Sequence, residues 1–180
     1  MYKRQVSETL SESVPARVDA LAREVCEGAC KHHLKLVTAE SCTGGLLASL
    51  LTDVEGVAHA FERGFVVYTN EAKHEMLGVP LDILQDPGPV SRVVAVALAE
   101  GALANSRGDI ALSITGFAGQ GAPGDPPGLV YFGVACRGGE TAYRMARFGD
   151  VGRGIVRVKS LEVALEMLRE AIASQGAAAR

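Results

Sequence analysis

Apolar residues recur every three or four positions near both ends of the chain, which is the spacing of one helix face. These positions are Val14, Val18, Leu21 and Val25, and later Leu161, Leu165, Leu168 and Ile172. Three further helices are predicted over residues 44–53, 70–78 and 91–106. Ser13, Asn70 and Ser91 are the expected N-cap residues, because their side chains can accept a hydrogen bond from the first helical turn.

Shorter apolar runs bounded by glycine and polar residues predict strands. They cover residues 34–40, 65–70, 109–116, 129–136 and 140–148. The last two strands are joined by residues 137–139, a loop short enough for an antiparallel hairpin. Residues 80–89 are expected to be irregular, and residues 176–180 are expected to form a frayed tail.

Helices and strands alternate along most of the chain and a hairpin follows, which favours an α/β fold. We predict a single-domain three-layer α/β sandwich with a mixed, mainly parallel sheet and helices on both faces. A length of 180 residues fits one domain. We place this domain at residues 13–175, between an N-terminal extension of residues 1–12 and a C-terminal tail of residues 176–180.

The net charge of −3 narrows the classes of partner. Proteins that bind nucleic acid usually carry a basic face, so we expect no nucleic-acid partner. The apolar stretches are short and interrupted by glycine or charge, so no membrane-spanning segment is predicted. The first residues, "MYKRQVSETLSE", lack the apolar core of a secretory signal. We therefore expect a cytoplasmic protein whose four cysteines are reduced thiols.

Cys26, Cys30, His32 and His33 resemble half of a zinc site, but no second Cys/His pair follows at a finger-like spacing. Cys26 and Cys30 lie four residues apart beside the apolar face of the first predicted helix. We interpret them as buried side chains, because a free cysteine behaves like a small apolar residue. We expect neither a metal nor another cofactor.

Three predicted loops follow strands, after Ala39, Tyr68 and Thr115. Ligands of open α/β sheets bind at the carboxyl ends of strands. The first loop reads "ESCTGG", and its strand-to-helix turn leaves free backbone N–H groups that attract anions. Ser41 at this bend is a helix cap, part of an anion cradle or a nucleophile. Neither a G-x-S-x-G nor a Walker A motif is present to decide between them.

The second loop reads "YTNEAK" and places Lys73 in the first turn of a helix, where the helix dipole disfavours a cation. A desolvated lysine can act as a base, and the alternative is an ordinary solvated lysine. The third loop, residues 115–128, is rich in glycine. It is either a ligand-facing loop that binds through its backbone or a plain surface loop.

These segments together resemble the CinA C-terminal domain family, whose enzymatic members are nicotinamide-nucleotide amidases. The matching stretches are "TAESCTGGLLASLLTDVEG", "FERGFVVYTNEAKHEMLGV", "GPVS", "LAEGAL", "DIALSITGFAG" and "GLVYFGVA". The resemblance covers roughly residues 15–175. It implies an α/β domain that hydrolyses the carboxamide of nicotinamide mononucleotide to the acid and ammonia, without a metal.

The resemblance also implies roles for single residues. Ser41 is the implied nucleophile, and Lys73 is the implied base, acting directly or through Tyr68. Backbone N–H groups of the first loop are expected to stabilise the oxyanion, and arginine side chains are expected to bind the phosphate. The expected substrate-binding residues are Glu40, Cys42, Thr43, Gly44, Gly45, Asn70, Thr115, Gly116, Arg153 and Arg157.

Two stretches depart from the family pattern. The third loop reads "AGQGAPGDPPG" where the family usually has "AGP", and Gly149-Asp150 lies two residues earlier than the family's "GDR" spacing expects. Cys42, beside Ser41, is a rival nucleophile by residue type. The alternatives to the amidase are a non-catalytic nucleotide-binding module and an amidase for another carboxamide. The hairpin strands and the last helix could support a homo-oligomer.

Overall fold

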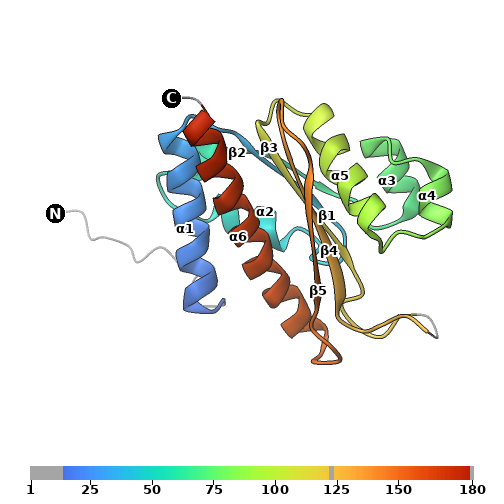
Figure 1. Cartoon of the computed structure of the whole chain (residues 1–180). Helices are drawn as coiled ribbons and strands as arrows, with labels where there is room; N and C mark the ends of the chain where they lie inside the picture. Colours follow the sequence, from blue (N-terminus) through green and yellow to red (C-terminus); the bar gives the residue numbers. More distant parts are fainter. Residues whose placement is uncertain (1–13, 122–123, 179–180) are drawn as a thin grey trace.

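The computed structural model describes residues 14–121 and 124–178. Five strands form one sheet in the order β2-β1-β3-β4-β5 (Figure 1). The strands are β1 (Leu36–Glu40), β2 (Phe61–Val66), β3 (Ile110–Gly116), β4 (Leu129–Cys136) and β5 (Ala142–Arg147). β1 pairs in parallel with β2 and β3, whereas β3–β4 and β4–β5 are antiparallel. The predicted mixed sheet and its terminal hairpin are confirmed, with two of the four pairings parallel.

Helices cover both faces of this sheet, as Figure 1 shows. One face carries α1 (Ala16–Lys31), α2 (Leu46–Thr52) and the long α6 (Arg153–Ala178). The other face carries α3 (Asn70–Leu77), α4 (Leu81–Gln85) and α5 (Arg92–Ala104). Each face buries its own apolar cluster, because alternate residues of a strand point to opposite sides of the sheet. The three-layer α/β sandwich is therefore confirmed.

Several boundaries differ from the predicted ones. β2 ends at Val66 and begins four residues earlier than expected, because the polar segment "FERG" pairs with β1 at the edge of the sheet, where polar side chains are tolerated. Residues 80–89 are not wholly irregular, since they contain α4. α6 continues to Ala178, so residues 176–178 are helical rather than frayed.

The predicted helix caps are confirmed in part. Ser91 accepts a hydrogen bond from the N–H of Val94 (3.4 Å) and caps α5. α3 is capped by Thr69, whose hydroxyl accepts from the N–H of Ala72 (3.2 Å), and Asn70 is already the first helical residue. The predicted cap Ser13 lies outside the described residues.

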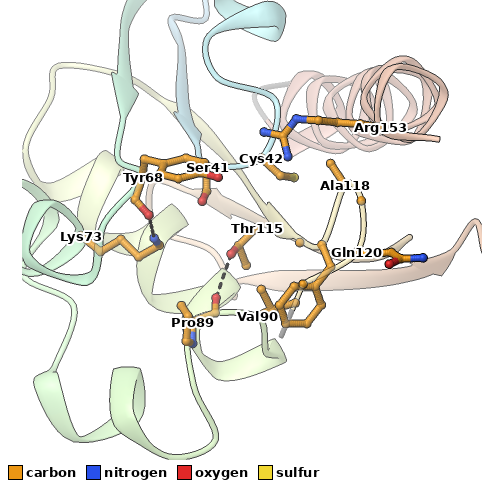
Figure 2. Close-up of a pocket in the computed structure, with 14 residues that line it drawn as sticks. Ser41, Cys42, Tyr68, Lys73, Pro89, Val90, Thr115, Ala118, Gln120 and Arg153 are labelled. Carbon is orange, nitrogen blue, oxygen red and sulfur yellow. Dashed lines mark hydrogen bonds between the residues drawn. The ribbon is translucent and has the colours of Figure 1, made fainter. Parts of the chain in front are cut away.

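The carboxyl ends of β1, β2 and β3 point to the same edge of the sheet, because these strands are parallel. The loops that follow them meet there and line a pocket (Figure 2). The end of α3 lies close to α5, since a Cβ on Gly101 would collide with the backbone carbonyl of Leu77. No helix in the described residues is long and apolar enough to cross a membrane.

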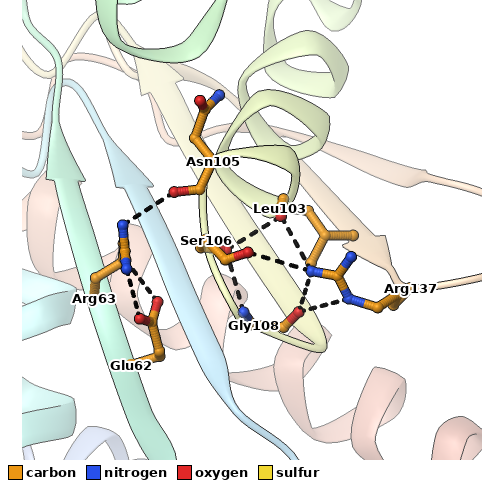
Figure 3. Close-up of polar contacts among 7 residues, drawn as sticks. All are labelled: Glu62, Arg63, Leu103, Asn105, Ser106, Gly108 and Arg137. Atoms are coloured by element: carbon orange, nitrogen blue, oxygen red, sulfur yellow. Dashed lines mark hydrogen bonds and ion pairs between the residues drawn. The ribbon is translucent and has the colours of Figure 1, made fainter.

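The loop that ends α5 is held by an arginine from the β4–β5 hairpin (Figure 3). Arg137 donates to the carbonyls of Leu103, Ser106 and Gly108, with the shortest contact from Nη2 to Gly108 at 2.8 Å. The last carbonyls of a helix lack partners within the helix, and a cation there also interacts favourably with the helix dipole. Arg137 thus fixes the segment that leads into β3.

Candidate active site

The pocket has a volume of about 240 Å³ and collects residues from all three predicted loops. Ser41 and Cys42 come from the first loop, Tyr68 and Lys73 from the second, and residues 115–121 from the third. The remaining lining residues are Pro89, Val90 and Arg153. Figure 2 shows Lys73 and Thr115 reaching the pocket from the α3 and β3 sides, with Ser41 and Cys42 above them.

The first loop is organised by the buried carboxylate of Glu40. Glu40 is fully buried and folds over the start of α2. Its Oε2 accepts from the N–H groups of Gly45 (3.1 Å) and Leu47 (3.0 Å), and its Oε1 accepts from Ala48 (2.8 Å). The helix N-terminus that we expected to receive a ligand anion is therefore already filled by a side chain of the protein.

Because of this arrangement, the glycine N–H groups of the loop are not the expected oxyanion donors. The N–H of Gly44 donates to the Ser41 carbonyl (3.1 Å) and the N–H of Gly45 is taken by Glu40, so neither is free. Among the described backbone groups, the N–H groups of Cys42 and Thr43 have no backbone acceptor. They follow Ser41 directly in the chain, which is where an oxyanion site for a serine nucleophile belongs.

Ser41 is held in place by the sheet. Its N–H donates to the carbonyl of Ile114 on β3 (3.0 Å), so the bend begins at the last rung of the β1–β3 pairing. The side chain is largely buried at 8% exposure, yet it lines the pocket. Ser41 does not cap α2, because Gly45 occupies the N-cap position and the carboxylate of Glu40 accepts from the first turn. The helix-cap alternative for Ser41 is therefore wrong.

Lys73 is buried, with 2% of its surface exposed, and is not an ordinary solvated lysine. Its Nζ donates to the backbone carbonyls of Tyr68 (2.7 Å) and Thr69 (3.4 Å). No salt bridge joins it to an acidic residue in the described parts of the chain. Burial lowers the pKa of Lys73 from its usual value, because desolvation disfavours the charged ammonium.

The two carbonyls leave room for a neutral lysine to act as an acceptor. A neutral amine has two N–H groups and one lone pair, and both N–H groups find an acceptor at Tyr68 and Thr69. The lone pair is then free to accept a proton from a group in the pocket. The role of Lys73 as a base stays a prediction.

Cys42 lines the same pocket but is poorly activated. Burial raises the pKa of the Cys42 thiol to about 11, and the nearby carboxylate of Glu40 adds to this effect. Only a very small fraction of such a thiol is ionised at neutral pH, and the thiolate is the nucleophilic form. The Cys42 thiol is therefore not ionised at neutral pH, and the choice of Ser41 as the reacting group stays a prediction.

The two arginines have different places in the structure. Arg153 is exposed and lines the pocket, where its guanidinium is available to an anion. Arg157 does not line it, and its Nη2 donates to the carbonyl of Thr43 (2.6 Å) behind the first loop. Arg157 therefore supports the turn that carries Cys42 and Thr43.

Of the other predicted binding residues, some line the pocket and the others lie outside it. Thr115 and Gly116 line the pocket, and the hydroxyl of Thr115 donates to the carbonyl of Pro89 (2.8 Å). Asn70 lies outside it, with its amide donating to the carbonyl of Leu84 (3.4 Å). The predicted residues that do not line the pocket are Glu40, Thr43, Gly44, Gly45, Asn70 and Arg157.

Pro89 and Val90 have no role predicted from the sequence, although both line the pocket. A signal is present in the stretch "GPVS", which includes them and ends in Ser91 at the cap of α5. Phe117 and Gln120 also line the pocket, and they come from the loop whose sequence departs from the family pattern.

Comparisons with known proteins give a consistent picture. The CinA C-terminal domain matches residues 18–172. The chain is 46% identical over 136 residues to the nicotinamide-nucleotide amidohydrolase PncC of Escherichia coli K12, which covers 74% of this chain and 81% of that protein. It is 47% identical over 133 residues to a CinA-like protein of Akkermansia muciniphila, covering 73% of this chain. The chain spans 32% of the length of that relative and 42% of a CinA-like protein of Kosmotoga olearia.

The crystal structure of the competence/damage inducible protein CihA from Agrobacterium tumefaciens has the same fold. Its TM-score is 0.84 at 42% identity, over 89% of this chain and 98% of that one. The fold and the pocket define a single α/β domain with a pocket at the carboxyl ends of parallel strands. The chain belongs to the CinA C-terminal domain family.

Proposed function

We propose that this chain hydrolyses the carboxamide of nicotinamide mononucleotide to nicotinate mononucleotide and ammonia, a step in pyridine nucleotide salvage. One observation carries the proposal. Ser41 and the buried Lys73, which come from different loops, line a single pocket in a chain that is 46% identical to a nicotinamide-nucleotide amidohydrolase. A nucleophile, a base and oxyanion donors are the parts that amide hydrolysis needs.

In the first half of the reaction, Ser41 Oγ attacks the carboxamide carbon and its proton passes to the lone pair of Lys73 Nζ. The oxygen of the tetrahedral intermediate becomes negative and is bound by the N–H groups of Cys42 and Thr43. The carbon–nitrogen bond then breaks, and the protonated Lys73 returns the proton to the leaving nitrogen, which departs as ammonia. Ser41 is left as an ester of the nicotinate ring.

In the second half, water takes the place of ammonia. Lys73, now neutral again, removes a proton from this water as it attacks the ester carbon. The ester bond to Ser41 Oγ breaks, and Oγ regains its proton from Lys73. The net change is the consumption of one water and the release of the acid and ammonia.

The size of the pocket indicates which part of the substrate it encloses. A volume of about 240 Å³ lies below the roughly 300–1,000 Å³ of cavities that enclose a drug-sized ligand. We infer that the ring and its carboxamide enter the pocket, while the ribose and phosphate lie at its mouth. The exposed guanidinium of Arg153 is the phosphate partner in this arrangement.

The proposal is tested by incubating the purified chain with nicotinamide mononucleotide and measuring both products by mass spectrometry and an ammonia assay. We expect equal amounts of ammonia and nicotinate mononucleotide. Lys73→Met should slow turnover by about 10²- to 10⁴-fold, the range that a general base contributes, without loss of nucleotide binding. Binding without turnover in the wild-type chain would contradict the proposal.

A further inference from the structure

The side chain of Tyr68 lines the pocket and makes no hydrogen bond to the rest of the described structure. Its contact with Lys73 runs through its backbone carbonyl, so that contact does not depend on the phenol. Its hydroxyl makes no hydrogen bond to any described residue. The side chain is 64% exposed, and Figure 2 shows its ring extending toward Ser41. The ring therefore presents an exposed aromatic face to the pocket that Ser41 also lines.

The charge of the pocket makes this face important. None of the described residues that line it is an aspartate or a glutamate, whereas Lys73 and Arg153 are basic. The nitrogen of the nicotinamide ring carries a positive charge when it is joined to ribose. A cation in a pocket without a carboxylate needs another source of negative potential, and the face of an aromatic ring supplies it.

We propose that Tyr68 acts through its aromatic face, which stacks on the cationic ring of the substrate and makes the site prefer a charged ring, and that its hydroxyl relays no proton. This role of Tyr68 rests on the proposed function, since the nucleotide is the ligand invoked. It assigns the proton transfer to Lys73 alone, whose two N–H groups are already bound to carbonyls.

The charged ring also favours the chemistry at Lys73. A positive charge close to an amine disfavours its protonated form. Binding of the pyridinium on Tyr68 therefore adds to the effect of burial and keeps Lys73 neutral at the moment when it must accept the proton of Ser41. A neutral ring in the same place would lack this effect.

The test separates the ring of Tyr68 from its hydroxyl. Tyr68→Phe keeps the ring and Tyr68→Leu removes it, and both keep the backbone carbonyl that binds Lys73. Tyr143→Leu is the matched control, because Tyr143 is an exposed tyrosine of β5 outside the pocket. For each variant we would measure kcat and KM with nicotinamide mononucleotide, and the inhibition constant of its 1,4-dihydro form, whose ring is neutral.

We expect Tyr68→Phe to keep kcat and KM within about threefold of the wild type. Tyr68→Leu should raise KM for the charged nucleotide by roughly 5-fold or more, within the 2- to 30-fold range of cation–π contacts. The inhibition constant of the neutral form should change less than twofold, and Tyr143→Leu should change nothing.

Three results would overturn this role. If Tyr68→Phe turned over substrate at least about 100-fold more slowly than the wild type, the loss expected for a proton-transfer group, the hydroxyl would be a proton relay. An unchanged KM in Tyr68→Leu would remove the ring from the site, and equal weakening of both ligands would reduce it to an uncharged apolar contact. Absence of turnover in the wild type contradicts the proposed function instead, so the two failures are distinguishable.

Discussion

Replacing Glu40 with glutamine tests whether this buried carboxylate builds the loop that carries Ser41. Glu40 accepts three backbone N–H groups, two at Oε2 and one at Oε1. A glutamine that places its oxygen at the Oε2 position keeps the bonds from Gly45 and Leu47. Its NH₂ group then faces the N–H of Ala48, where neither group can accept.

The expected change in the free energy of unfolding follows from these contacts. Leaving one buried donor unsatisfied costs about 1–3 kcal/mol, and removing a negative charge from a helix N-terminus costs up to about 1 kcal/mol more. We therefore expect Glu40→Gln to lower the free energy of unfolding by about 1–4 kcal/mol. A domain of ordinary stability, about 5–15 kcal/mol, still folds after this loss, so activity can be measured on the variant.

The assay is urea unfolding followed by circular dichroism, with the transition midpoint and its slope determined for each variant. Glu170→Gln is the matched control, because Glu170 is 60% exposed in a surface ion pair with Arg144 and such pairs contribute about 0–1 kcal/mol. We also expect kcat to fall in Glu40→Gln while the control is unchanged. A change in unfolding free energy below about 0.5 kcal/mol for Glu40→Gln would refute this account of the loop.

Three further predictions concern the base, the phosphate and the hairpin arginine. Because burial lowers the pKa of Lys73 and the proposed mechanism uses its neutral amine, we expect kcat/KM to rise with pH and level off below 10.5, the usual lysine value; a rate that falls across this range would contradict the base role. Arg153→Met should raise KM for nicotinamide mononucleotide by about 10-fold and leave KM for the phosphate-free riboside unchanged, as steady-state assays with both substrates would show. Arg137→Met should lower the free energy of unfolding by about 1–3 kcal/mol without changing kcat, because Arg137 binds carbonyls far from the pocket; an unchanged urea midpoint would contradict its role.

The architecture is predictable from the sequence because apolar periodicity reports directly on burial. The strand over "DIALSITG" and the helix after Ser91 are predicted almost at their observed bounds, since each has a strong pattern and a clear start. The prediction for β2 is displaced because an edge strand needs no apolar alternation, and the apolar run after it enters the core under α5 at Val67. The pairing with β1, a long-range contact, decides the bounds of β2.

Only those features of the candidate site that follow from the parallel strands are predictable from the sequence. Loops after three parallel strands must meet at one edge, and Ser41, Lys73 and Thr115 line one pocket there. The sequence does not show that Glu40 fills the helix N-terminus or that Arg157 turns behind Thr43. Both contacts depend on side-chain directions that residue type and spacing leave open.

The most direct test of the central claim compares Ser41→Ala with Cys42→Ala in the release of ammonia from nicotinamide mononucleotide. The two residues are neighbours in one loop, and their replacements remove a hydroxyl and a thiol respectively. We predict that Ser41→Ala lowers kcat/KM at least about 10³-fold, as for the loss of an enzymatic nucleophile, while Cys42→Ala stays within about 10-fold of the wild type. Turnover that survives in Ser41→Ala but is lost in Cys42→Ala would contradict the serine mechanism.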